Sequence, residues 1–527
     1  MKPSFLFAVG LRQTQANVTP LAPERRRWQS PPARRGAAYA AYAAYTACTA
    51  CALLMALPTW GQSAPDTRPS APTSALPTLQ RTGEVWHTVL PNGLTVLIRP
   101  DHRAPTAAHM LWVRVGSVDE VNGLTGVAHV LEHMMFKGTP SIKPGEYSRR
   151  IAALGGRDNA FTSRDATAYH QQIPSAALPE VMRLEADRFA HNRWDDTEFR
   201  NEIEVIKEER RQRVDDQPRA LLYEQLFAQM WQSHPYRQPV IGWMNDLEHL
   251  QPDEVRQFHQ RWYVPNQAAV VVAGDVDPPQ VLQWAMQTYG AVPARPTPTR
   301  KPQTEAPQRG SRELVVHGPA EQPYLALAFQ APRLRDPDGQ DADSRDALAL
   351  MMLAAVLDGY EGARLGRALV QRPEGQRLAD SAGAGYSGSG RGPAVFILDA
   401  IPAAQQDPKA LALALREQVH TIARDGVTAT ELQRVKNQWR ASDIYKLDAV
   451  FAQARELGAA WVNGWPVDAH ERLRQSLMRV TPEAVQAVAQ RYFDAKQMTQ
   501  ALLLPDPEAL AERRKAAATR PRLDGRH

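Results

Sequence analysis

The chain has 527 residues, of which 43% are hydrophobic and 23% are charged. This length exceeds one ordinary domain, and the composition is that of a globular protein, which excludes a wholly disordered chain and a fibrous repeat. The formal net charge is +5, but seven basic residues and one acidic residue fall within the first 63 positions. The rest of the chain is therefore close to neutral. Because it also contains no recognisable module for nucleic acid, we expect no nucleic-acid partner.

The first 63 residues have the three parts of an export signal. Basic residues continue to Arg35, an uncharged stretch follows over 36–58, and small polar residues near position 62 offer a cleavage site. We therefore predict a signal peptide over residues 1–63 and an exported, periplasmic protein. An uncleaved N-terminal membrane anchor is the alternative, because this uncharged stretch is long enough to span a bilayer. Cys48 and Cys51 both lie in it, so a mature chain would have no disulfide and no thiolate metal site.

The next segments predict a linker and a first domain. Residues 64–83 are rich in Pro, Ser, Thr and Ala, which is typical of a linker. VWHTVL and LTVLIR flank a Pro-Asn-Gly turn and predict a β-hairpin, AAHMLWVRVG predicts a third strand, and AAVVVAGDV predicts a buried strand. The pattern is helical after Gly126, with long helices expected over 179–193 and 196–214. Residues 84–293 are therefore predicted to form one domain.

A second change of composition occurs over residues 294–312, where Pro and polar residues replace periodic segments, and we predict a second linker there. The order of elements then partly repeats, with the strand-like runs LVVHG and YLALAFQAP followed by the helical run RDALALMMLAAVLDG. This repetition predicts an internal duplication, with a second domain over 313–505. Residues 506–527 are predicted to be a basic tail that is frayed and solvated.

The segment TGVAHVLEHMMF contains His129, Glu132 and His133 with the apolar spacing of a buried helix. Residues four apart lie on one face of a helix, so the two histidines can reach the same ion. Two neutral imidazoles that bind zinc, beside a carboxylate that can take a proton from water, form an arrangement found in peptidases. Two histidines placed four residues apart by chance are the alternative, so the motif needs context.

A catalytic zinc ion needs a third protein ligand, and the helical segment NEIEVIKEERR offers four glutamates. Helical geometry places Glu209 on the apolar side with Val205 and Ile206, and Glu202 close to the same line. Buried carboxylates are costly unless a positive group holds them. Glu209 as a metal ligand and Glu202 as a supporting residue would meet that requirement. A charged surface helix with accidental registry is the alternative.

These residues resemble the inverted zincins of the pitrilysin and insulinase type, which include the β subunit of the mitochondrial processing peptidase and many bacterial periplasmic proteins. The resemblance is carried by LPNGLTVLIRPDHRAP, VGSVDEVNGLTGVAHVLEHMMFKGT, GGRDNAFTSRDATAYH and EIEVIKEERRQRVDDQP. It implies that His129, His133 and Glu209 bind one Zn²⁺ per chain in the first domain. It further implies that Glu132 is the general base and that Glu202 supports the site.

The resemblance also implies the fold. We expect an α+β protein of two similar domains, each a mostly antiparallel β-sheet covered by helices, which together form half of a clamshell chamber.

The stretch GGRDNAFT, residues 155–162, resembles the edge strand that lies beside the zinc ion in this family. The free N–H and C=O groups of an edge strand can bind any peptide backbone in extended form. Asn159, Ala160 and Phe161 are therefore candidate substrate contacts. A plain turn into a strand is the alternative.

Members of the family complete the active site with an Arg and a Tyr from the later, non-zinc domain. The comparable stretch here is RALVQRPEGQRLADSAGAGYS, in which Asp380 occupies the position expected for the Tyr. Arg372 and Tyr386 are displaced candidates. Because loss of the pair removes transition-state hydrogen bonds, we expect a heterodimer with a sister peptidase-like subunit that supplies them, with a homodimer as the second choice.

The sequence thus predicts an exported zinc metalloendopeptidase that hydrolyses peptides or unfolded polypeptide segments in an enclosed chamber. A non-catalytic or partner-dependent scaffold subunit of a peptidase heterodimer is the alternative, because the family includes chains that keep the fold and lack the activity. The intact HxxEH motif together with Glu209 favours the enzyme, since a pure scaffold has no physical need of them.

Overall fold

The computed structural model describes residues 77–373 and 375–519. The predicted signal peptide and most of the predicted linker over 64–83 lie outside the described residues, and so does the end of the predicted tail. Within the described ranges, no helix is long and apolar enough to cross a membrane.

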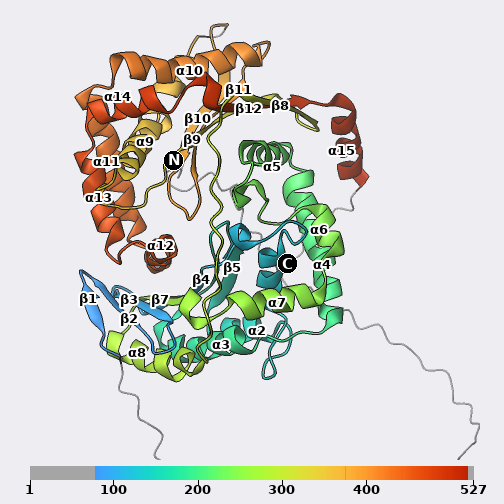
Figure 1. The fold of residues 1–527 in the computed structure, drawn as a ribbon, viewed down its shortest axis with the longest axis vertical. Coiled ribbons are helices and arrows are strands. Elements are labelled where there is room, and N and C mark those ends of the chain that lie inside the picture. Colours follow the sequence, from blue (N-terminus) through green and yellow to red (C-terminus); the bar gives the residue numbers. More distant parts are fainter. Residues whose placement is uncertain (1–76, 374, 520–527) are drawn as a thin grey trace, which may run out of the picture. The chain divides into compact units, whose positions relative to one another are not determined.

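The first half of the chain forms a seven-stranded sheet (Figure 1). Its strands are β1 (Gln80–Thr82), β2 (Val85–Val89), β3 (Thr95–Pro100), β4 (Thr106–Val113), β5 (Arg157–Thr162), β6 (Thr167–Pro174) and β7 (Ala268–Gly274). They lie in the order β1-β2-β3-β7-β4-β6-β5, and the parallel pair is β3–β7. The predicted hairpin, third strand and buried strand are confirmed as β2–β3, β4 and β7.

The second half forms a five-stranded sheet. Its strands are β8 (Arg312–Gly318), β9 (Tyr324–Ala331), β10 (Ala379–Ser387), β11 (Ala394–Pro402) and β12 (Met498–Pro505), in the order β10-β11-β9-β12-β8. Here β8–β12 is the parallel pair. The second sheet repeats the order and strand directions of five strands of the first sheet. In this repeat, the strands from β3 to β7 correspond one by one to the strands from β8 to β12. This repeated topology confirms the expected α+β fold of two similar, mostly antiparallel domains.

Helices follow the strands in each half. In the first half they are α1 (Val127–Met134), α2 (Glu146–Ala153), α3 (Leu178–His191), α4 (Asp196–Arg210), α5 (Pro218–Met230), α6 (Met244–His249), α7 (Pro252–Trp262) and α8 (Pro278–Gln287). In the second half they are α9 (Ala342–Asp358), α10 (Pro408–Asp425), α11 (Ala429–Lys446), α12 (Val450–Asn463), α13 (Ala469–Arg479), α14 (Pro482–Arg491) and α15 (Pro507–Thr519). The two predicted long helices of the first domain correspond to α3 and α4.

Two segment boundaries differ from the prediction. β1 lies inside the stretch predicted as a linker, because its residues pair with β2 and extend the sheet. The start of the predicted tail forms α15, which is helical because the Asp506 side chain accepts hydrogen bonds from the N–H groups of Glu508 and Ala509 at its first turn. Residues 292–311, which include most of the predicted second linker, contain no helix or strand.

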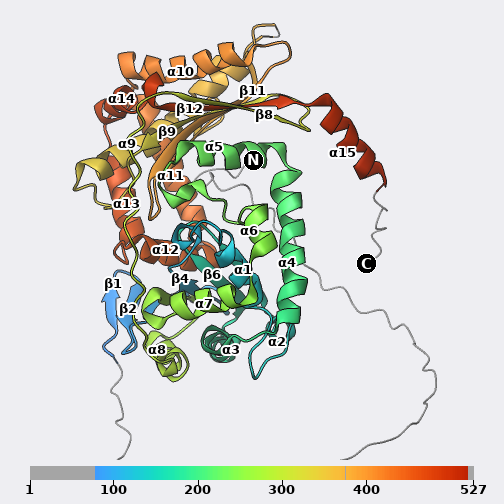
Figure 2. The same cartoon turned by 45° about the vertical axis from the view of Figure 1, so that its right-hand side comes forward.

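Each sheet has one face covered by helices of its own half and another face contacted by a helix of the opposite half. α12 packs on β4 and β7 of the first sheet, and α5 packs on β12 and β8 of the second sheet (Figures 1 and 2). Each half therefore contributes one helix that packs on the sheet of the other half, an arrangement called the helix exchange below. This exchange brings residues near position 455 next to residues near position 160.

α12 lies close to the first sheet at Gly458. A Cβ atom at this position would overlap the indole nitrogen of Trp112 on β4. Gly458→Ala is therefore expected to lower the free energy of unfolding by about 1–3 kcal/mol through overpacking, which urea unfolding would measure. Gly310→Ala is the matched control, because a Cβ there meets open space. Equal stability of the two variants would show that α12 does not pack this closely.

Candidate metal centre

Helix α1 is short, buried and closely held at its first turn. Gly126, which precedes it, has a φ of +86°, and a Cβ there would lie 2.6 Å from the carbonyl oxygen of Ile241, so the position requires glycine. The Glu120 carboxylate accepts hydrogen bonds from the N–H groups of Gly126 and Ala128, both at 2.9 Å. These bonds satisfy donors that a helix leaves free at its start. They fix the direction of the polar side chains of the HxxEH motif.

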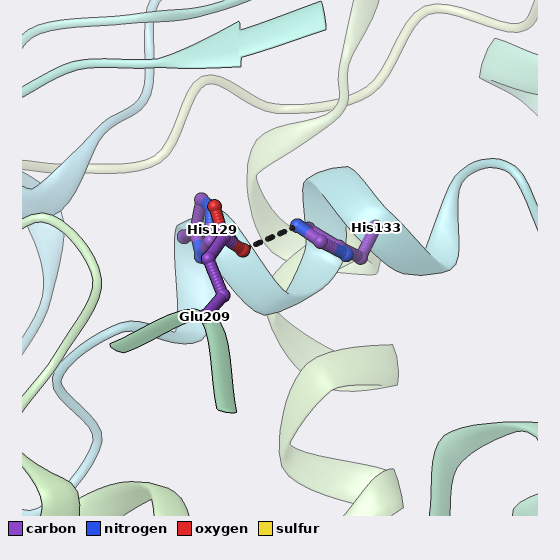
Figure 3. Close-up of side chains that lie close together, drawn as sticks. All are labelled: His129, His133 and Glu209. Atoms are coloured by element: carbon purple, nitrogen blue, oxygen red, sulfur yellow. Dashed lines mark ion pairs between the residues drawn. The ribbon is translucent and has the colours of Figure 1, made fainter. Parts of the chain in front are cut away.

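The side chains of His129 and His133 on α1 and of Glu209 on α4 point toward one another (Figure 3). Glu209 Oε2 lies 3.4 Å from His133 Nε2 and 3.8 Å from His129 Nε2. Each residue can offer one ligand atom, and these atoms lie within 4.8 Å of one another. The fold thus brings together the three predicted metal ligands from two helices that are distant in the sequence.

The three ligand atoms fit a zinc ion. Two ligands of a tetrahedral zinc ion lie about 3.4 Å apart, which is close to both of the separations from Glu209. At 3.8 Å, His129 Nε2 is too far from Glu209 for a hydrogen bond, so a shared cation would satisfy both groups. Two imidazoles and one carboxylate leave a fourth position open, which is typical of a catalytic zinc site.

Glu202 orients one of the two imidazoles. His133 Nδ1–H donates a hydrogen bond to Glu202 Oε1 at 2.8 Å, and the Lys137 ammonium pairs with the other carboxylate oxygen. This bond directs His133 Nε2 toward Glu209. Carboxylates hold many zinc-binding histidines in this manner, so the contact is the one that the predicted supporting role of Glu202 requires.

The end of α4 holds Glu209 in place. α4 continues into a π-helix, Arg211–Asp215, whose Arg213 Nη1 lies 2.5 Å from Glu209 Oε1. Sequence reasoning missed Arg213, although its spacing of four residues from Glu209 was an available signal. The sequence also predicted that Glu209 shares an inward helix face with Val205 and Ile206. In the structure Ile206 is buried, but Val205 is exposed. Glu209 therefore lies at the border of the buried face.

Glu132 lies between the two histidines in the sequence and is buried. Its Oε2 accepts a hydrogen bond from Thr162 Oγ1 at 2.5 Å, so the carboxylate is held where α1 meets the end of β5. Thr162 was not predicted from the sequence, because only the position of β5 in the folded sheet brings this residue next to α1. Burial raises the pKa of Glu132 above its ordinary value, which suits a group that takes up and releases a proton near neutral pH.

The other ionisable groups of the site influence one another strongly. Burial lowers the pKa of His129 to about 3. Burial would also lower the pKa of His133, but hydrogen bonds to Glu202 and Glu209 outweigh it and raise that pKa to about 10. Burial opposes ionisation of Glu209, yet the two histidines lower its pKa to about 2. A bound cation would replace the proton on His133, because imidazole binds a metal in its neutral form.

β5 carries the predicted substrate contacts and is the last strand of its sheet. Its outer N–H and C=O groups therefore face away from the sheet. Asn159 Oδ1 accepts a hydrogen bond from the N–H of Ala160 at 2.8 Å, so this backbone donor has a side-chain acceptor. Phe161 packs edge-on against Trp112 of β4.

The candidates from the second half have other partners. Asp380 on β10 forms an ion pair with Arg377 at 2.8 Å. The Tyr386 ring packs into the second core, and its hydroxyl donates to the carbonyl of Pro332. Arg372 is exposed. In the part of the chain that the structure describes, none of these three predicted candidates contacts the metal ligands.

A buried ion pair supports the end of α1. Arg188 Nη2 lies 2.7 Å from Glu185 Oε2 on α3, and both side chains are almost inaccessible to water. The Arg188 guanidinium lies over the rings of Phe136, Tyr147 and Tyr169, at 4.0–4.6 Å from their centroids. Phe136 lies just after α1, so this packing holds the helix that carries the two histidines.

Two family models match the sequence. The insulinase model of peptidase family M16 matches residues 95–243, which include every predicted residue of the metal site. The model of the M16 inactive domain matches residues 249–439.

Similar proteins include enzymes named as zinc proteases. The zinc protease PqqE of Helicobacter pylori is 29% identical over 427 residues, which are 79% of this chain and 92% of that protein. A probable mitochondrial-processing peptidase subunit beta of Arabidopsis thaliana is 25% identical over 378 residues, 70% of this chain and 69% of that protein.

Solved structures show the same fold. A protease from Helicobacter pylori has a TM-score of 0.74 at 27% identity, covering 82% of this chain and 100% of that one. The periplasmic protease PqqL from Escherichia coli has a TM-score of 0.67 at 20% identity, covering 85% of this chain and 52% of that one. The likeness to PqqL concerns the fold alone.

The contact between Glu202 and His133 leads to a prediction on metal affinity. Glu202→Gln is expected to weaken zinc binding about 10-fold or more, because it removes the charge that holds His133 in its ligating orientation. Competition with a chromogenic chelator would measure this. Glu204→Gln is the matched control, since Glu204 lies on the same helix, is exposed and pairs with Lys207. Equal zinc affinities in the two variants would contradict the orienting role.

The buried ion pair leads to a prediction on pH. Burial would raise the pKa of Glu185, but Arg188 outweighs burial and keeps it below the ordinary value of 4.5. The folded protein therefore binds this proton less readily than the unfolded chain. The stabilisation is present above pH 4.5 and is lost as the pH falls through the lower, folded-state pKa.

Glu185→Gln is accordingly expected to lower the free energy of unfolding by about 3–5 kcal/mol at pH 7, because Arg188 loses its buried counter-charge. The difference from the unmodified protein should shrink below pH 4.5, as denaturant unfolding at several pH values would show. Glu180→Gln changes a partly exposed residue on the same helix and should have a small effect on the free energy of unfolding. A Glu185→Gln effect independent of pH would refute the assignment.

Proposed function

Because the chain belongs to the M16 (insulinase) family of peptidases, we propose that it is a zinc metalloendopeptidase that hydrolyses peptides or unfolded polypeptide segments. The observation that carries the proposal is the convergence of His129, His133 and Glu209 on one point. The buried Glu132 lies on the same helix as both imidazoles. A scaffold would have no need to keep these costly groups together.

Glu132 acts as the general base in this proposal. A zinc ion held by His129, His133 and Glu209 would supply a Lewis acid that polarises the scissile carbonyl and lowers the pKa of a water molecule. Glu132 removes a proton from the attacking water and later delivers it to the leaving amine. The raised pKa of Glu132 supports both transfers, and the hydrogen bond from Thr162 keeps the carboxylate oriented.

The substrate binds to β5 as an added strand. The free edge of β5 offers backbone donors and acceptors to any extended peptide, and β5 ends at Thr162 beside Glu132. The peptide carbonyl replaces Asn159 Oδ1 as the acceptor for the N–H of Ala160. Asn159 thus covers this donor until a substrate arrives.

A second peptidase-like half completes the active site in this proposal. The Tyr386 hydroxyl already donates to a carbonyl of its own domain, which supports a transition-state Arg and Tyr from elsewhere. The chain covers 52% of PqqL and 97% of the first half of PqqL, and another relative is named a beta subunit. We propose a heterodimer with a sister subunit, or otherwise a homodimer, that encloses a chamber.

Export to the periplasm belongs to the same proposal. It is supported by the signal-like sequence of residues 1–63 and by the periplasmic location named for PqqL.

The test of the proposed function combines zinc analysis with peptide cleavage. The full chain, Glu132→Gln and the control Glu204→Gln should each contain about one zinc ion, because none of these changes removes a ligand. Glu132→Gln should cut a quenched peptide library at least about 100-fold more slowly than the other two. Absence of zinc in all three would overturn the metal site. Zinc without cleavage by the unmodified chain would favour the partner-dependent alternative.

A further inference from the structure

We propose that the β5 edge selects peptides with an acidic side chain near the cleaved bond, and that Arg455 of α12 recognises that side chain. This inference rests on the proposed function, because it names the substrate class of the same site.

α12 brings a guanidinium group next to the substrate-binding strand. The Arg455 guanidinium lies 5.5 Å from the ring centroid of Phe161 on β5. One turn earlier, the Phe451 ring lies 4.7 Å from the His170 ring on β6. A residue of the second half is therefore part of the surroundings of β5.

Arg455 lies on the face of β5 that is opposite to the metal ligands. Successive side chains of a strand point to opposite faces. Thr162 faces Glu132, so Phe161, Asn159 and Arg157 point to the other face, toward α12. An added peptide strand alternates in the same way. Every second substrate side chain then points toward α12.

Arg455 has no counter-charge of its own. Its side chain is exposed, and it forms no ion pair or hydrogen bond with any residue that the structure describes. The carboxylate of Glu456, the next residue in the chain, lies 3.9 Å from His470 Nδ1, and that of Asp448, at the turn before α12, pairs with Arg103 at 3.1 Å. A cation beside a binding edge that pairs with no described carboxylate of its own chain is suited to an acidic ligand.

Arg157 adds a second positive charge to this surface. It is the first residue of β5, is exposed and has no ion pair within the described ranges. Asp158, its neighbour, points to the opposite face and accepts a hydrogen bond from Ser148 Oγ at 2.7 Å. The α12-facing side of β5 is thus positive.

The geometry also predicts which position of the substrate carries the acidic residue. A residue directly opposite Phe161 on an added strand has its Cβ about 4.5–5.5 Å from the Cβ of Phe161. An Asp or Glu there reaches the guanidinium that lies over the Phe161 ring, and such a pair forms charge-assisted hydrogen bonds. Phe161 precedes the residue that holds Glu132, so this substrate position lies within about two residues of the cleaved bond.

The test measures charge preference in binding separately from cleavage. Fluorescent peptides that differ at one position, as Glu, Gln or Lys, are titrated onto the zinc-loaded full chain carrying Glu132→Gln, and the position is scanned along the peptide. At one position Glu should bind about fivefold more tightly than Gln, with Lys weakest, because a single exposed ion pair contributes about that factor. Cleavage by the unmodified chain should show the same order in kcat/KM.

Variants of Arg455 identify the recognising group. Arg455→Gln should abolish the preference for Glu over Gln, Arg455→Lys should keep much of it, and Arg455→Glu should reverse it in favour of Lys. Arg440→Gln is the matched control, because Arg440 is an exposed arginine on α11. This control should keep the full preference.

The outcomes separate this inference from the proposed function. Peptide cleavage with no preference that depends on Arg455 would overturn the inference and leave the peptidase in place. No cleavage, but charge-selective binding that depends on Arg455, would overturn the unaided peptidase and support the acidic-peptide site. Failure of every peptide to bind would overturn the inference as well.

Discussion

The candidate metal centre depends on the balance of charge among ionisable side chains that are largely removed from water. Burial opposes the ionised form of each carboxylate, so positive partners have to be supplied. Lys137 faces Glu202, Arg213 faces Glu209, and His133 lies between the two carboxylates. A divalent cation fits the same arrangement because it can replace the proton on the imidazole. The positions of α1 and α4 are therefore coupled by electrostatics and not by apolar packing alone.

The surrounding protein keeps these groups rigid. Glu120 and Gly126 define the start of α1, and the Glu185–Arg188 pair lies under the aromatic residue that follows it. Ordering of this kind lowers the cost of holding a catalytic group in position during a reaction. Glu132 gains its position from two sources, since its helix is held by these contacts and its carboxylate is held by a strand residue.

The duplicated topology explains how distant residues reach one site. Each half contains the same five-stranded arrangement. The helix after β4, α1, carries the HxxEH motif, whereas α9, the helix after the corresponding strand β9, does not. The exchanged helices then place α12 on the first sheet and α5 on the second. The second half thus contributes Arg455 to the surroundings of β5, although none of its described residues belongs to the candidate metal site. Under the proposed recognition by Arg455, the second half influences which peptides bind.

Local patterns in the sequence predicted β2, β3, β4, β7, β8 and β9 and the helices α3, α4 and α9, because spacings of two, three and four residues directly report a strand or a helix face. The same spacings placed His129 and His133 on one helix face as candidate metal ligands. They did not predict strands such as β6 and β11 or the long helices α10 and α11. Helical geometry on the segment NEIEVIKEERR suggested Glu202 as a supporting residue, and the likeness to a known family suggested the edge strand. The contacts of Thr162, the exposure of Val205 and the position of Arg455 followed from the folded chain. These features depend on how sheets and helices pack across large distances in the sequence, and no local periodicity carries that information.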